Sequence, residues 1–170
     1  MTHESIERPA GYSPRVAFLL AMTEECRGRT LRLVGDMDPA QIDTPTAWNG
    51  NTVGALLYHI AAIELDWLYA EVMVKDFPAE TGTWFPHDVR EEGGRLSPAV
   101  GDSVEKHLAR LAWVRERMRV ELAALGDNDL DAIRESGDRT VTPEWVFHHL
   151  MQHEAEHRGQ LGEILASRGK

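Results

Sequence analysis

Apolar residues recur at steps of three or four along four long segments of the chain, and this spacing places them on one face of an α-helix. The segment after Asn51-Thr52 shows the pattern best, with apolar positions at Val53, Leu56, Ile60, Ile63, Trp67, Ala70 and Val74. Similar stripes occur over residues 14–37, in a segment that ends near Leu125, and over residues 143–167. The first of these includes Val16, Leu20, Leu31 and Val34. The pattern therefore predicts four helices, each with one side facing a core.

Residues that favour helix starts precede these segments. Ser13-Pro14, Asn51-Thr52 and Thr142-Pro143 each offer a side chain that can cap free backbone N–H groups. Two of the three add a proline, which is tolerated in the first turn of a helix. Ser97-Pro98 starts either the third helix or a short turn before it. The positions of these caps support the helices that the apolar pattern predicts.

Two segments between the helices are long. Residues 75–96 contain two prolines and three glycines, and they predict an irregular connection of a kind that often carries function. Residues 126–141 are polar, with one short extended piece near residues 139–141. The chain has 170 residues, enough for one domain with its own hydrophobic core. We therefore predict a single all-α domain over residues 1–170, a four-helix bundle in which a crossover joins the second and third helices.

Composition excludes several classes of partner. The formal charge is −10 and no segment clusters Lys and Arg, which argues against a nucleic-acid partner. The single cysteine, Cys26, excludes an intrachain disulfide and a thiolate-rich zinc site. Residues 1–14 carry charged side chains where a signal peptide has its apolar core, and no apolar run approaches the ~18 residues of a membrane-spanning helix. We expect a cytoplasmic protein with no membrane partner.

Histidines interrupt the apolar stripe of the last helix. Continued through the middle of that helix, the stripe reaches His153 and His157. Side chains four residues apart lie one above the other on a helix, so both imidazoles can face one ion. On the second helix, His59 lies at the edge of the buried stripe, three residues after Leu56. A third imidazole is therefore available from a facing helix.

Three neutral imidazoles suit zinc, nickel, iron or copper, and three protein ligands leave coordination positions for water or substrate. The alternative is that each histidine is a hydrogen-bonded core residue, which is the usual role of a buried histidine. Two interior histidines on adjacent turns cost stability unless they are satisfied, and a third on another helix strengthens the metal interpretation. We therefore expect His59, His153 and His157 to bind one divalent ion, with zinc or nickel ahead of iron and manganese.

Other residues near this face are weaker candidates for binding a cofactor or substrate. Gln160, seven residues after His153, either orients a water or ligand or packs between helices. His149, four residues before His153, can extend the row as a fourth ligand or as a pocket residue, and its drift around the helix favours a role beside the ligands. Arg158 can bind an anion, although surface packing is the simpler interpretation.

The remaining polar candidates have ordinary alternatives. Glu64 and Asp66 can accept the second ring N–H of a metal-bound histidine, although most helical carboxylates are solvated. His87 lies in the long connection, where it closes over the site or has no role. Three other histidines are expected on other faces or on the surface: His3, His107 and His148. Four tryptophans are interpreted as core or interface residues: Trp48, Trp67, Trp84 and Trp145.

The run His153-Glu154-Ala155-Glu156-His157-Arg158-Gly159-Gln160 resembles the signature of the DinB-like (YfiT-like) metal-binding superfamily. The segment 48–67, which contains Gly54-Ala55-Leu56-Leu57-Tyr58-His59, is similar to that family's second helix, which provides its first metal histidine. The resemblance extends over the whole chain in length and helix order. It implies that the metal ligands are His59, His153 and His157, that the helices run up-down-down-up, and that the chain forms a homodimer.

The resemblance leaves the reaction open. Members of the family include mycothiol-dependent maleylpyruvate isomerase and bacillithiol transferases, and others are assigned as metal-dependent hydrolases. Our first expectation is a metal-dependent transferase that joins a low-molecular-weight thiol to an electrophile, because an ion can stabilise the thiolate of a thiol whose free pKa is ~8.5. A hydrolase comes second, because no acidic residue is plainly placed as its general base. A non-enzymatic metal-binding stress protein comes third.

Overall fold

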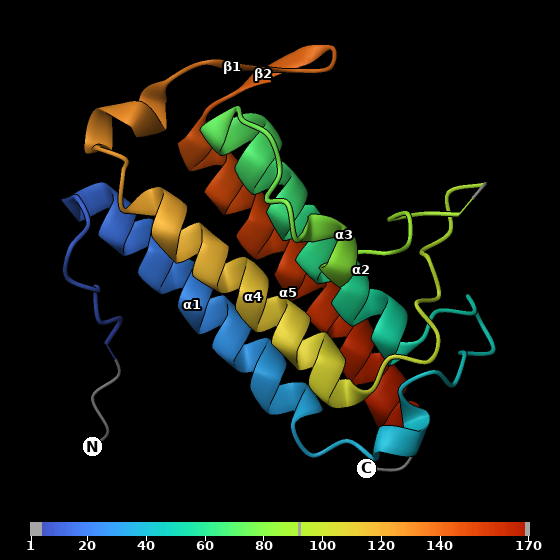
Figure 1. Ribbon diagram of the computed structural model, residues 1–170. Coiled ribbons are helices and arrows are strands. Elements are labelled where there is room, and N and C mark those ends of the chain that lie inside the picture. The colour runs from blue at the N-terminus through green and yellow to red at the C-terminus, as the bar shows by residue number, and fades with distance from the viewer. Residues whose placement is uncertain (1–4, 92, 169–170) are drawn as a thin grey trace.

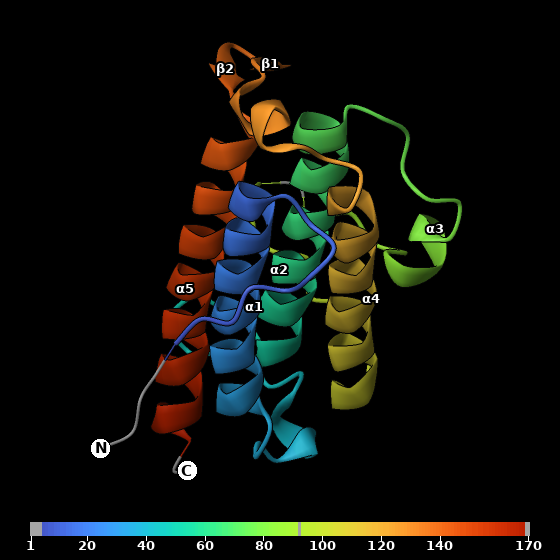
Figure 2. The ribbon, with the colours of Figure 1, turned by 90° about the vertical axis from the view of Figure 1, so that its left-hand side faces the viewer.

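Four long helices lie side by side in the computed structural model, which describes residues 5–91 and 93–168 (Figure 1). They are α1 (Pro14–Val34), α2 (Val53–Trp67), α4 (Val104–Leu122) and α5 (Pro143–Ser167). In Figure 1, α1 and α5 run downward along the chain while α2 and α4 run upward, and Figure 2 shows the same directions. The predicted all-α four-helix bundle with up-down-down-up order is confirmed. None of the described helices has both the length and the apolar character needed to cross a membrane.

The helix starts follow the capping residues. Oγ1 of Thr52 accepts a hydrogen bond from the backbone N–H of Ala55 at 2.9 Å, and Oγ1 of Thr142 caps the first turn of α5 in the same way. Ser13 precedes α1 without a side-chain cap, and Pro14 occupies the first turn. Helix α4 begins later than Ser97-Pro98, since Ser103 is its capping residue. The intervening chain has positive φ angles at Ala99 and Gly101, which no α-helix accommodates.

The helix ends differ from the predicted bounds by about one turn. Helix α1 ends at Val34 rather than residue 37, and α4 ends at Leu122 rather than Leu125. Helix α2 continues as a π-helical segment, residues 68–73, and stops at Val74, where φ is 50°. The helical stripe predicted from Val53 therefore reaches its expected end at Val74, although its last turns are π-helical and wider than an α-helix.

Two connections carry most of the irregular structure. The crossover from α2 to α4 contains the short helix α3 (Thr81–Trp84) and an isolated bridge between Arg90 and Leu96. Before α5, a 3₁₀ turn leads into the antiparallel hairpin of β1 (Arg134–Ser136) and β2 (Arg139–Val141). The extended piece predicted near residues 139–141 is therefore β2, and its pairing with β1 was not predicted. Figure 2 shows this hairpin at the end of the bundle where α2 finishes and α5 starts.

The bundle core is apolar around a charged centre. Each of the four long helices contributes one ionised residue to this centre, at most 4% exposed: Arg27 from α1, Glu64 from α2, Arg115 from α4 and Glu154 from α5. Arg27 donates to Glu154 at 2.8 Å and to Glu64 at 2.5 Å, and Arg115 donates to Glu64 at 2.9 Å. Buried charges require such partners.

Leu31, predicted on the core stripe of α1, is 39% exposed instead.

Candidate metal centre

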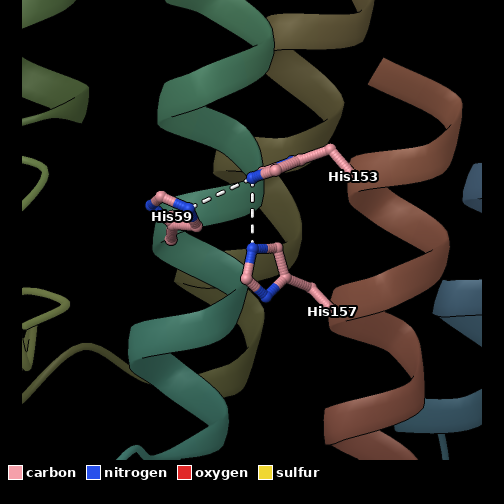
Figure 3. Close-up of side chains that lie close together, drawn as sticks. All are labelled: His59, His153 and His157. Carbon is pink, nitrogen blue, oxygen red and sulfur yellow. Dashed lines mark hydrogen bonds between the residues drawn. The ribbon is translucent and has the colours of Figure 1, made fainter. Parts of the chain in front are cut away.

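Three imidazoles meet between α2 and α5. His59 is buried on α2, whereas His153 and His157 are half-buried and lie one turn apart on α5. Nε2 of His153 lies 3.1 Å from Nε2 of His59 and 3.1 Å from Nε2 of His157 (Figure 3). One ligand nitrogen from each of the three rings lies within 4.8 Å of the other two. The structure therefore brings together the three histidines that the sequence singled out.

The hydrogen bonding of His157 favours a ligand role. Its Nδ1 lies 3.2 Å from Oε1 of Gln160, one turn further along α5. An amide oxygen only accepts hydrogen bonds, so Nδ1 carries the ring proton and Nε2 presents a lone pair to the other two rings. Gln160 thus contacts a histidine of the group directly, and the role in orienting a water or ligand that the sequence offered for it stays a prediction. A carbonyl or amide partner of this kind fixes the tautomer of metal-binding histidines.

Burial keeps these imidazoles neutral. It lowers the pKa of His59 and of His153 from 6.5 to about 3, and it also lowers the pKa of His157. Mutual repulsion contributes, as does the guanidinium of Arg90 in the crossover, which acts on all three rings. Neutral imidazole is the form that binds metal. The three rings are therefore in the binding form at pH 7.

The donor set fits a divalent transition metal. Among the described residues, the group consists of three imidazoles with no carboxylate or thiolate, and Nδ1 of His59 is buried without a hydrogen-bond partner. Imidazole nitrogen suits zinc, nickel, iron or copper. A site with three protein ligands leaves further coordination positions, and the partial exposure of His153 and His157 leaves one side open to a small molecule.

Comparison with known proteins identifies the family. The sequence profile of the DinB superfamily matches residues 22–161. The chain belongs to the DinB superfamily. Two solved structures of similar fold are a conserved Enterococcus faecalis protein (TM-score 0.68, 15% identity, 88% of this chain and 96% of that one) and Bacillus subtilis YfiT (TM-score 0.65, 19% identity, 99% and 93%). YfiT is described as a probable metal-dependent hydrolase with an unusual four-helix bundle topology. No curated protein matches the sequence.

His149 lies beside the three imidazoles of this DinB-superfamily chain and is not one of their group. Its ring stacks on Trp145 at 5.1 Å with an interplanar angle of 6°, and it lies 4.7 Å from the ring of Trp67. Its centroid is 6.2 Å from that of His153. His149 therefore lies beside the imidazole group and packs between two tryptophans, and its role as a pocket residue stays a prediction.

Three other candidates from the sequence make no hydrogen bond to the imidazoles. Glu64 is buried and accepts hydrogen bonds from Arg27 and Arg115 in the charged core, so it is neither a partner of a histidine N–H nor a solvated carboxylate, the two roles considered for it. Nη1 of Arg158 donates to the carbonyl oxygen of Cys26 at 3.1 Å and contacts its sulfur at 3.3 Å, which ties α5 to α1. Asp66 is exposed and makes no hydrogen bond to His59 in the described residues.

The remaining histidines also have definite places. His107 was predicted at the surface and is fully buried instead, with Nδ1 3.0 Å from the guanidinium of Arg110. His148 is exposed as predicted, and His3 lies outside the described residues. His87 is exposed in the crossover, where its backbone carbonyl accepts a hydrogen bond from Tyr58 at 2.6 Å. That bond holds the crossover against α2 beside His59.

Arg90 is a neighbour of the imidazoles that sequence reasoning missed. Its guanidinium repels the protonated forms of all three rings, and it also donates to the carbonyl of Gly94 at 2.8 Å within the crossover. The available signal was a cation inside residues 75–96, the connection already predicted to carry function. Trp67 and Trp84 are half-buried and pack against other aromatic rings, in keeping with the predicted core or interface role, whereas Trp48 and Trp145 are exposed.

Proposed function

We propose that the chain is a metal-dependent transferase that joins a low-molecular-weight thiol to an electrophile. His59, His153 and His157 would hold one divalent ion, with zinc or nickel first. The convergence of three neutral imidazoles without an accompanying carboxylate, among the described residues, carries this proposal. Among the described residues, this group offers no carboxylate that could serve hydrolysis as a general base, and a thiol whose pKa the ion lowers needs none.

Residues around the proposed ion would have separate roles. A divalent ion bound by the imidazoles supplies Lewis acidity, which lowers the pKa of a coordinated thiol and keeps its sulfur nucleophilic at neutral pH. Gln160 holds the His157 ring in the tautomer that presents Nε2. His59, buried on α2, closes the inner side of the site against water. Arg90 adds positive charge beside the site and favours an anionic reactant.

The sulfur has to come from another molecule. Cys26 lies on α1, where its Sγ contacts the backbone carbonyl of Met151 at 3.5 Å and the guanidinium of Arg158 at 3.3 Å. Burial raises the pKa of this thiol, which disfavours the reactive thiolate. Cys26 is therefore a packing residue between α1 and α5.

A metal-dependent hydrolase is the second candidate, supported by the description of YfiT. In that case the ion would lower the pKa of bound water to about 7. The site would then need a proton acceptor, and the substrate itself or the exposed Glu156 next to His157 is available for that role.

One reaction panel separates the candidates. Zinc-loaded and nickel-loaded protein is incubated with 1-chloro-2,4-dinitrobenzene and, in turn, glutathione, bacillithiol, mycothiol and coenzyme A, and a parallel set contains p-nitrophenyl esters. The transferase predicts a C–S bond formed with loss of chloride, above the uncatalysed rate and absent in His153→Ala. Ester cleavage without thiol conjugation would favour the hydrolase. Neither product, with metal bound, would favour a non-enzymatic metal-binding protein.

We further propose that the chain works as a cytoplasmic homodimer, as its family resemblance implies. Sedimentation equilibrium of the metal-loaded protein tests the assembly. A mass near twice 19.1 kDa is expected, and a monomer at all concentrations would contradict it.

A further inference from the structure

An aromatic row leads away from the metal centre along α5. Trp145, His149, His153 and His157 follow one another at four-residue intervals, the spacing of one helix face. His149 bridges the two ends, since its ring contacts both the ring of Trp145 and that of His153. The ring of Trp67, at the end of α2, packs against His149 from the neighbouring helix. The rings therefore form an unbroken series of contacts from the imidazoles to the end of the bundle.

Arg139 closes the far end of this row. Its Cζ lies 5.3 Å from the centroid of the Trp67 ring and 5.1 Å from that of the Trp145 ring. A guanidinium that lies over aromatic rings can still donate its N–H groups to an oxyanion. Among the residues that the structure describes, no carboxylate or carbonyl accepts a hydrogen bond from the Arg139 side chain. Arg139 is exposed, and the nearby carboxylate of Glu71 interacts with it only through its charge.

The β1–β2 hairpin fixes the position of Arg139. Arg139 opens β2 and pairs with Ser136 across the turn, where Gly137 has φ of 63°. Oγ of Ser136 donates to Oε1 of Glu71 at 3.1 Å, which fastens the hairpin to the π-helical end of the second helix. A hollow of about 370 Å³ lies beside Arg139 and Trp145 and gives a ligand room to reach the guanidinium.

We propose that Arg139, Trp67, Trp145 and His149 form a subsite for an oxyanion group of the substrate. A carboxylate or phosphate would pair with the guanidinium edge while an apolar or aromatic part of the same molecule lies along the row. As a statement about substrate class, the inference rests on the proposed function, because the other end of that molecule would react at the metal centre. The substrate is then an anion whose apolar or aromatic part lies between Arg139 and the imidazoles.

Calorimetry with sulfur-free probes tests the subsite on metal-loaded protein. Biphenyl-4-carboxylate, biphenyl-4-phosphonate and the neutral biphenyl-4-carboxamide share one shape and differ in charge. The anions are expected to bind the native protein about fivefold more tightly than the amide. Comparing the carboxylate with the phosphonate shows which oxyanion fits better. The preference should vanish in Arg139→Gln, fall in Arg139→Lys, and persist in Arg32→Gln, which removes an exposed cation from α1.

Equal binding of anion and amide to the native protein would overturn the subsite. So would a preference that survives Arg139→Gln, because the anion would then be held elsewhere, for example at the metal. The thiol 4′-mercaptobiphenyl-4-carboxylate separates this result from the proposed function. If sulfur adds no affinity while the charge preference depends on Arg139, the thiol proposal fails and the subsite stands. If sulfur adds affinity without a charge preference, the reverse holds.

Discussion

Nδ1 of His157 donates to Oε1 of Gln160 across 3.2 Å, one turn along α5. The bond fixes the neutral tautomer and turns the Nε2 lone pair of His157 toward Nε2 of His153, 3.1 Å away. Gln160 thereby sets which nitrogen of His157 is available to a metal ion between α2 and α5. The relationship predicts a measurable effect on metal affinity.

Gln160→Leu is expected to weaken metal binding about 10–100-fold, because the His157 ring loses the partner that fixes its tautomer and orientation. Competition with a chromophoric chelator measures the change. Gln152→Leu, at an exposed position of the same helix, is the matched control and should bind metal as the native chain does. Equal affinities for both variants would show that Gln160 does not support the site.

Two helical glycines predict opposite stability changes. A Cβ at Gly54 would lie 3.0 Å from Nε2 of the buried His107 and 3.3 Å from Oδ1 of Asp43, so Gly54→Ala should destabilise the protein by about 1–3 kcal/mol. A Cβ at Gly162 meets its nearest neighbour at 4.0 Å, so Gly162→Ala should stabilise it by up to ~1 kcal/mol. Urea unfolding of both variants checks the signs. Stabilisation by Gly54→Ala would mean that His107 is free to move.

Glu154→Gln should destabilise the fold by about 3–5 kcal/mol, because it leaves the buried guanidinium of Arg27 without one of its carboxylates. The exposed pair of Glu25 and Arg29, at 2.7 Å, gives the matched control. Glu25→Gln should cost far less, because water screens an exposed ion pair. Chemical denaturation of both variants measures the difference, and comparable losses would contradict the account of the charged core.

His107 makes stability depend on pH. Burial, reinforced by the nearby guanidinium of Arg110, lowers its pKa from 6.5 to about 4. As pH falls, the unfolded chain binds a proton near 6.5 while the folded chain does not, so this residue lowers the free energy of unfolding between pH 6.5 and 4. The slope should reach at most ~1.4 kcal/mol per pH unit. His107→Gln should remove this contribution, measured by denaturation at several pH values, and an unchanged slope would place His107 in contact with water.

The fold and the imidazole cluster could be predicted from the sequence for a physical reason. Apolar spacing and capping residues are local signals, and they located four helices whose ends differ by about a turn. The triad combined two local features, a histidine pair four residues apart and a third histidine on another stripe. Its convergence needed only that α2 and α5 be neighbours, which the resemblance to a known bundle supplied.

The charged core and the burial of His107 could not be predicted from the sequence in the same way. A helical stripe was interpreted through its apolar members, so Arg27 was passed over although it continues the steps from Leu20 through Thr23 to Val34. A charged residue at a core position acquires meaning only when its partners on other helices are known. Here those partners come from α2 and α5, whose faces meet only in the folded chain. The same reason hid Arg139, which gains its role from tryptophans on α2 and α5.

Metal content measured by elemental analysis tests the central claim most directly. The native chain should carry one equivalent of zinc or nickel per polypeptide, and His153→Ala should lose it while circular dichroism shows its helices intact. His148→Ala, at an exposed position of the same helix, should keep the full equivalent. A His153→Ala protein that retains the native metal content would contradict the assignment of the three imidazoles.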